Sequence, residues 1–263
     1  MEAISPLTCE LENTVCIDAE GSDAEAFLRA QLTRNPPPLG GAHSVPAAWL
    51  DARGRVQALF QLLGLEDRWL LLAESASAED VAAKLRRFVL RSRVRLGVDP
   101  KRRVLAFLGG EDAWWAERRL SPMRDAGGVS MTAGTVWLAL GPGLVLAIGS
   151  ADALGSAAAR LARVDAEREA LAEIRLGLPR LYGALAARYV PQMLNLDLLG
   201  AIAFDKGCYP GQEVVARLKY RGSVKRRMGR FACGPTKLPP APGNEIIGAD
   251  GETAGEVVRA ART

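Results

Sequence analysis

The stretch KGCYPGQEVVAR, residues 206–217, places one cysteine between two chain-bending signals. The four residues from Tyr209 to Gln212 fit a type II turn, because proline suits its second position and glycine supplies the positive φ of its third. Gly207 allows close approach of the backbone on the other side of the cysteine. After the turn, acid precedes base, in the order that a helix dipole favours. The stretch therefore predicts a turn that presents Cys208 just before a short helix.

Two interpretations of Cys208 follow from these residues. A position before a helix start and beside Lys206 favours the thiolate, and so a nucleophile or a soft-metal ligand, although Asp205 opposes this effect. The other interpretation is a buried or partly buried cysteine that is chosen for its size. The residues alone leave both open.

The basic segment, residues 217–230, reads RLKYRGSVKRRMGR and holds seven arginines and lysines and no acid. Such a run is typical of a solvated face or of a charged hairpin edge. It would also suit an anion, either a polycarboxylate tail or RNA phosphates. Tyr220 is its single aromatic residue, so a platform for base stacking has little support.

Composition, charge and cysteine spacing bound the size of the core, the kind of ligand and the prospect of a metal site. The 263 residues are 49% hydrophobic and 24% charged, enough for a substantial core in one large domain or two to three small ones. The net charge of +4 is compatible with an anionic small ligand or nucleic acid but diagnostic of neither. The cysteines, at positions 9, 16, 208 and 233, have no metal-binding spacing, and the single histidine, His43, lies in a Pro/Gly-rich loop. We expect no resident metal.

The sequence also carries no visible targeting signal. Its start is acidic and polar, and its longest uncharged run is broken by a Gly-Pro-Gly at residues 141–143. Neither a P-loop nor a GxGxxG that opens a helix is present. We therefore expect a cytoplasmic protein with free thiols and no membrane contact.

The order of predicted elements favours an α+β fold over a doubly wound one. Hydrophobic periodicity and caps predict helices over residues 24–32, 77–90, 111–120 and 151–174. Strands are predicted over residues 47–51, 56–65 and 68–74 as an antiparallel meander, then over 94–99, 102–109, 135–140 and 144–149. We place a domain boundary near Arg230.

The cysteine stretch, with Arg221-Gly222 and the KRR of residues 225–227, resembles the signature of the YgfZ proteins. These are folate-binding relatives of the glycine-cleavage T protein. Weaker matches follow in the family's order: AFLRAQLT (26–33), LDARGRVQALF (50–60), VLRSRVRL (89–96), EIRLGLPRL (173–181) and VPQMLNLD (190–197). The resemblance covers about residues 20–260.

This resemblance implies a fold and a function. The fold would be a T-protein-like ring of two intertwined α+β modules around a folate site over residues 1–230, followed by an apparently short C-terminal β-barrel portion over residues 231–263. The function would be folate-dependent support of iron–sulfur cluster assembly or repair in client enzymes, such as a tRNA methylthiotransferase. The expected cofactor is tetrahydrofolate or a folate derivative, and the expected partners are the client enzymes, with a weak contact to tRNA.

The resemblance also assigns site residues. The family's functional cysteine matches Cys208, with Lys206 beside it, and we take both as catalytic. We place the folate contacts on Arg175, Tyr209, Gly211, Gln212, Glu213, Arg217 and Arg221.

Two departures from the T protein bear on its activity. Where the T protein has a catalytic aspartate after the hairpin glycine, this chain has Ala58 and Leu59, and nothing obvious polarises an aminomethyl transfer. Where the T protein has a folate-contacting glutamate, this chain has Arg175, a donor-only group. We therefore predict folate recognition without aminomethyltransferase activity. The alternatives are a folate-dependent one-carbon transferase and a tRNA-binding module that acts through residues 217–230.

Overall fold

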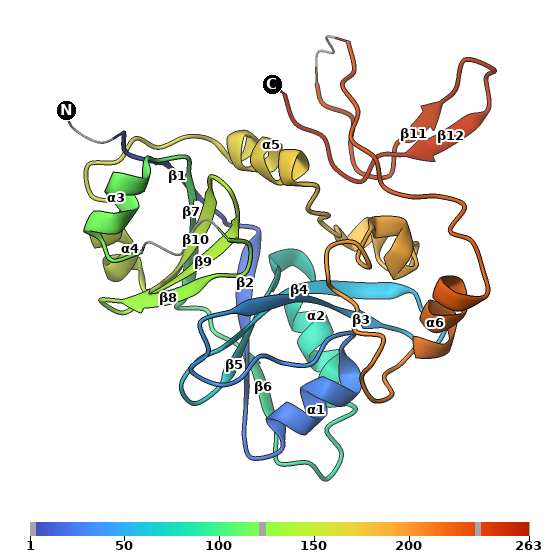
Figure 1. The fold of residues 1–263 in the computed structure, drawn as a ribbon, viewed down its shortest axis with the longest axis horizontal. Coiled ribbons are helices and arrows are strands. Elements are labelled where there is room, and N and C mark those ends of the chain that lie inside the picture. The colour runs from blue at the N-terminus through green and yellow to red at the C-terminus, as the bar shows by residue number, and fades with distance from the viewer. Residues whose placement is uncertain (1–3, 121–124, 235–237, 263) are drawn as a thin grey trace.

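The computed structural model describes residues 4–120, 125–234 and 238–262. Two five-stranded antiparallel sheets lie side by side at its centre, and helices cover their outer faces (Figure 1). The α+β class predicted from the sequence is confirmed.

The first sheet contains the predicted meander. Its strands run in the order β3 (Ser44–Leu50), β4 (Val56–Gly64), β5 (Trp69–Glu74), β2 (Thr14–Glu20) and β6 (Arg95–Val98). Helices α1 (Ala24–Gln31) and α2 (Ser75–Arg86) pack against one face of this sheet. Leu28 and Leu85 from the helices and Leu62 from β4 are fully buried in that core. Burial alternates along β4 as far as Gln61, as expected for a strand with one covered face, and Leu62 and Leu63 are then buried in the cores on its two faces.

The second sheet runs in the order β1 (Leu7–Glu10), β7 (Arg103–Leu108), β10 (Leu144–Gly149), β9 (Thr135–Gly141) and β8 (Val129–Thr132). Helices α3 (Asp112–Glu117) and α4 (Ala151–Ala157) cover its outer face around Phe107 and three tryptophans. Cys16, Leu70 and Leu146 belong to the core between the two sheets. Strands β1, β2 and β8 were not predicted from the sequence.

One predicted helix is wrong. Residues 151–174 form two helices, because α4 ends at Ala157 and α5 (Ala166–Leu176) begins after a break. Arg160 in that break has a φ of 68°, which no right-handed helix accommodates. Asp165 then caps α5, since its Oδ1 accepts a hydrogen bond from the Arg168 N–H at 3.2 Å.

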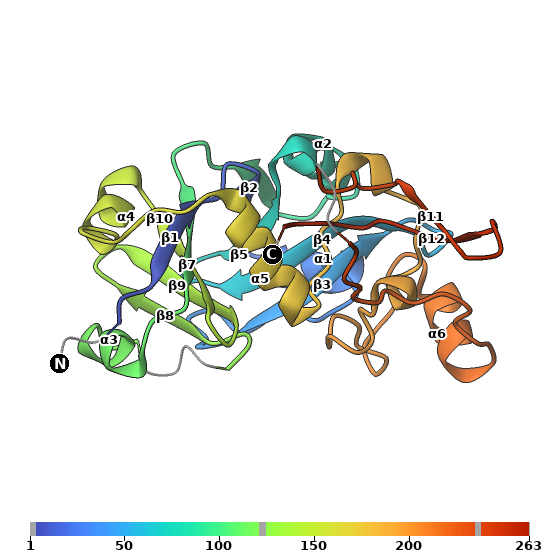
Figure 2. The same ribbon diagram turned by 90° about the horizontal axis from the view of Figure 1, so that it is seen from above.

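Helix α5 carries two buried acids on its inner face. Glu169 and Glu173 are 1% and 3% exposed, and the guanidinium groups of Arg180 and Arg259 contact both of them. We call these four residues the α5 charge cluster. The cluster ties the C-terminal segment to α5, and the last described residues lie beside this helix in both views (Figure 1 and Figure 2).

The last elements are α6 (Gln212–Tyr220) and a two-stranded sheet of β11 (Glu245–Ile247) and β12 (Thr253–Glu256). Helix α6 lies at the end of β3 and β4, and the two-stranded sheet stands apart from the two larger sheets (Figure 1). The barrel portion and the boundary near Arg230 stay predictions. Within the described ranges, no helix has the length and apolarity that crossing a membrane requires.

Candidate functional site

The Cys208 turn, residues 206–212, has the predicted type II geometry, but the predicted close approach at Gly207 is wrong, because a Cβ there would meet nothing within 4 Å among the described residues. Gly211 has φ 76° and ψ 2°, the values of the third position of a type II turn. The N–H of Gln212 donates to the carbonyl of Tyr209 at 3.2 Å and closes the turn. Cys208 precedes it and is exposed, so the interpretation as a buried cysteine chosen for its size is wrong.

The turn docks on the β3–β4 connection through two glycines. A Cβ on Gly211 would lie 2.6 Å from both the carbonyl oxygen of Asp51 and the Cα of Gly54. A Cβ on Gly54, whose φ is 72°, would lie 2.8 Å from the side chain of Val214. Backbone therefore meets backbone here, and only glycine fits at either position.

Asp51 fixes the connection on which the turn rests. Its Oδ1 accepts hydrogen bonds from the backbone N–H groups of Arg53 and Arg55, each at 2.9 Å. Its Oδ2 accepts from Nε2 of Gln57 at 3.1 Å. An aspartate that bonds its own backbone in this way rigidifies a tight turn. The aspartate of the LDARGR motif is thus a structural support for the cysteine-bearing turn.

Lys206 anchors the start of the Cys208 turn to α1. Its Nζ donates to the carbonyl oxygens of Arg29 at 2.6 Å, Leu32 at 2.5 Å and Arg34 at 3.3 Å. These are carbonyls at and just after the helix C-terminus, where a cation is favoured. Burial, with the positive charges of Arg29 and Arg34, lowers the pKa of Lys206 to about 8. This geometry gives Lys206 an anchoring role, and its catalytic role beside Cys208 stays a prediction.

The other predicted contacts divide into buried and exposed groups. Tyr209 is buried among apolar side chains, and burial raises the pKa of its phenol to about 12. Glu213, Arg217 and Arg221 are exposed on α6 and at its end. Arg175 lies apart from them on α5, where its carbonyl accepts a hydrogen bond from Nη1 of Arg230 at 2.7 Å. The structure thus brings the basic segment next to α5, but no described contact joins Arg175 to the Cys208 turn.

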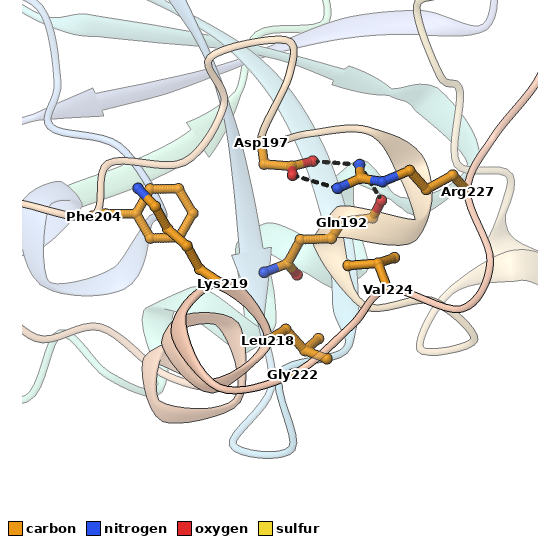
Figure 3. A pocket seen from close by; sticks show the side chains of 8 residues that line it. All are labelled: Gln192, Asp197, Phe204, Leu218, Lys219, Gly222, Val224 and Arg227. Carbon is orange, nitrogen blue, oxygen red and sulfur yellow. Dashed lines mark hydrogen bonds and ion pairs between the residues drawn. The ribbon is translucent and has the colours of Figure 1, made fainter.

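A pocket of about 390 Å³ lies between α6 and the chain before it, and we call it the α6 pocket. Its lining residues are Gln192, Asp197 and Phe204 from the chain before α6, and Leu218, Lys219, Gly222, Val224 and Arg227 from α6 and the chain after it (Figure 3). The sequence alone predicted no role for Gln192, Asp197 or Phe204. Gln192 and Asp197 lie in the VPQMLNLD motif, which carried the resemblance without pointing to a pocket.

Some cations around the α6 pocket are paired with a carboxylate and others are not. Arg227 pairs with both carboxylate oxygens of Asp197, at 3.0 and 2.8 Å, and this holds the pKa of Asp197 below its usual range. Lys219 instead places its Nζ 3.6 Å from the centre of the Phe204 ring. Within the described ranges, no carboxylate pairs with five cations of the basic segment: Arg217, Lys219, Arg221, Lys225 and Arg226.

The predicted contact residues fit the tail of a folate but not its pterin. Arg217 and Arg221 suit the carboxylates of a folate tail, because both are exposed and unpaired within the described ranges. Arg175 does not fit the amino edge of a pterin, which needs acceptors, and the neighbouring acids of α5 are already paired with arginines. Among the described residues, no group of three or more His, Cys, Asp or Glu side chains is arranged to hold a metal ion.

Comparison with known proteins identifies relatives in sequence and in fold. No protein-family model matches the chain. The tRNA-modifying protein YgfZ of Aliivibrio fischeri (strain MJ11) is 28% identical over 261 residues, which are 96% of this chain and 80% of that protein. The tRNA-modifying protein YgfZ of Edwardsiella ictaluri (strain 93-146) is 31% identical over 248 residues, 90% of this chain and 74% of that protein.

The fold is similar to that of the glycine cleavage system aminomethyltransferase T of Bartonella henselae. The TM-score is 0.73 at 18% sequence identity, over 97% of this chain and 73% of that one. At this identity the likeness shows the fold alone.

Proposed function

Because the chain belongs to the YgfZ family of tRNA-modifying proteins, we propose that it is a folate-binding accessory protein for iron–sulfur enzymes, with Cys208 as its reactive group. It supports the assembly or repair of clusters in client enzymes such as a tRNA methylthiotransferase. The proposal extends the resemblance of residues 206–217 to that family's cysteine signature.

The exposed thiol of Cys208 on a rigid turn is the observation that carries this proposal. Cys9 and Cys16 are buried, and burial raises the pKa of their thiols to about 11 and about 12, which makes them poor nucleophiles. A cluster is held by four thiolates as a rule, and the described residues gather no such set around Cys208. Cys208 would therefore contact a cluster that the client enzyme still holds, or exchange with a client disulfide.

Complementation tests the role of Cys208. In cells that lack their own copy of such a protein, the Cys208→Ala variant should fail to restore methylthio-modification of tRNA. Cys233→Ala is the matched control, because Cys233 is the other exposed cysteine and lies outside the turn. Full restoration by Cys208→Ala, at equal protein levels, would remove the cysteine from the mechanism.

Calorimetry with tetrahydrofolate and its polyglutamates tests the cofactor. If the tail meets Arg217 and Arg221, polyglutamates bind more tightly than the monoglutamate, and the advantage shrinks as salt increases. The double variant Arg217→Met and Arg221→Met should bind both forms equally. Absence of heat with every folate at millimolar protein would contradict folate binding. Turnover of an aminomethyl donor would instead favour a one-carbon transferase, against the side chains at Ala58 and Leu59.

A contact between the basic segment and tRNA is a second candidate function, which the five unpaired cations favour. Salt-dependent binding of tRNA should weaken when Lys225 and Arg226 are changed to Met. Arg227 is left intact, because it holds Asp197. Arg87→Met with Arg91→Met removes the same charge from the exposed segment after α2 and should leave binding unchanged.

A further inference from the structure

Gln192 presents an unsatisfied acceptor at the α6 pocket. Its side chain is 1% exposed, and its Nε2 donates to the carbonyl of Val215 at 2.8 Å. Because only an N–H can donate to that carbonyl, the amide orientation is fixed and Oε1 is the remaining atom. Among the described residues, no donor reaches Oε1. A buried acceptor without a partner is rare in folded proteins, and Oε1 of Gln192 can therefore accept a hydrogen bond from a group that enters the pocket.

The rest of the pocket defines that ligand. Leu218 and Val224 provide apolar surface near the Gln192 amide (Figure 3). The unpaired ammonium of Lys219 lies over Phe204 at the rim. Arg227 contributes no net charge, since Asp197 neutralises it. A matching ligand therefore has an N–H donor, a flat apolar body and an anionic group next to the donor-bearing part.

We propose that the α6 pocket binds one unpaired nucleotide, with a base N–H donating to Oε1 of Gln192 and the phosphate facing Lys219. Its volume of about 390 Å³ is at the low end of the roughly 300–1,000 Å³ of small-molecule sites, which suits one nucleotide. The proposal rests on the second candidate function, the contact between the basic segment and RNA.

The distribution of charge favours a nucleotide within a strand over a free one. Four further unpaired cations, Arg217, Arg221, Lys225 and Arg226, flank Lys219 along ten residues of chain. A single small anion is satisfied by one or two cations, whereas successive phosphates of a strand match a row of them. Single-stranded RNA also exposes the base edges that a protein pocket reads.

Fluorescence anisotropy of the full chain with short RNAs tests this proposal. The probes are labelled tetranucleotides that carry one base of each kind at the second position, and a matched tetranucleotide that is abasic there. The preferred base should raise affinity about tenfold over the abasic strand. Blocking its N–H should abolish that gain: N3-methyluridine is compared with uridine, and N6,N6-dimethyladenosine with adenosine. Free nucleoside monophosphates form a separate arm that tests a free nucleotide as the source.

Matched variants separate the pocket from the strand contact. Gln192→Met removes the acceptor and Val224→Trp fills the pocket, so each should erase the difference between base and abasic strands. Gln192→Met and Val224→Trp are each used only if the unfolding midpoint of the variant is close to that of wild type. Lys219→Met, on the surface, is a third variant that leaves the core intact. Lys225→Met is the control outside the pocket. It should weaken all strands equally and reduce the salt slope by about one unit while the preference for a base is kept.

The outcomes distinguish the two proposals. Salt-dependent binding that is equal for base and abasic strands overturns the nucleotide pocket and leaves the strand contact standing. Absence of binding by every strand and every monophosphate overturns both. Binding of a monophosphate without binding of strands supports the pocket and overturns the strand contact.

Discussion

The Cys208 turn and the α5 charge cluster are both held in one conformation, but by different means. In the turn, Gly211 lies against the backbone of Asp51 and Gly54 with no room for a side-chain carbon. In the cluster, charged side chains hold one another under α5. This difference determines which functional side chains of each region remain unpaired. The turn is fixed by backbone and keeps its thiol free, whereas the cluster uses every functional side chain for structure.

Removing one charge from the cluster should have the largest effect on stability. Arg259→Met leaves Glu169 and Glu173 buried with Arg180 alone, and breaking such a pair costs about 4 kcal/mol of unfolding free energy. Chemical denaturation measures the loss. Arg262→Met is the matched control, because its exposed pair with Glu167 contributes at most about 1 kcal/mol. Equal stability of the two variants would show that the cluster does not hold the C-terminal segment.

Adding one carbon to the turn should have the next largest effect. Gly211→Ala combines a positive φ with contacts of 2.6 Å, and we expect a loss of about 3 kcal/mol. Gly200→Ala isolates the backbone term, since Gly200 has a φ of 69° but nothing within 4 Å of its Cβ position, and should cost about 1 kcal/mol. Denaturation curves of both variants compare these costs. If the two losses agree, the contact with the β3–β4 connection adds nothing to the rigidity of the turn.

Thiol labelling distinguishes exposed cysteine thiols from thiols that are buried in the core. In the native protein, a disulfide reagent should modify Cys208 and Cys233 rapidly and Cys9 and Cys16 slowly. Raising the thiol pKa of Cys9 from 9.0 to about 11 alone reduces its thiolate about a hundredfold at neutral pH. Cys208→Ala should remove one of two fast equivalents. Four equal rates in folded protein would contradict the described burial.

A pH series on Lys206 tests how the start of the Cys208 turn is anchored to α1. Because burial lowers the folded-state pKa to about 8 from an ordinary value of 10.5, the unfolded chain binds more protons between these values. The free energy of unfolding of wild type should therefore rise from pH 8 to pH 10 relative to Lys206→Met. Denaturation at several pH values measures the difference. A constant difference would mean that the three carbonyl acceptors hold the pKa of the ammonium near its ordinary value.

The local parts of this molecule were predictable from its residues. Pro210 and Gly211 specify the type II turn, because each restricts or releases one backbone angle whatever surrounds it. The meander over residues 47–74 follows from its alternating apolar pattern and turn residues. The class of fold then follows from the order of the elements.

The parts that depend on distant contacts were not predictable. Glu169 and Glu173 resemble the solvated acids of any charged helix, and only the return of Arg180 and Arg259 in space makes them buried. Lys206 was singled out for its place beside Cys208, and nothing in the sequence predicted that its ammonium would contact the carbonyls of α1. Nothing in the sequence pointed to a role for Gln192, which is indicated only by the absence of a donor to its Oε1 among the described residues.

The platform under the Cys208 turn has a consequence for the order of folding. Asp51 and Gly54 belong to an early hairpin, while Gly211 is synthesised long afterwards. A local hairpin of this kind forms readily, and contacts between remote parts of a chain form late. The thiol is therefore displayed only after most of the protein has been made and packed. In a nascent or partly denatured chain, the same cysteine would lack the β3–β4 connection that fixes its orientation.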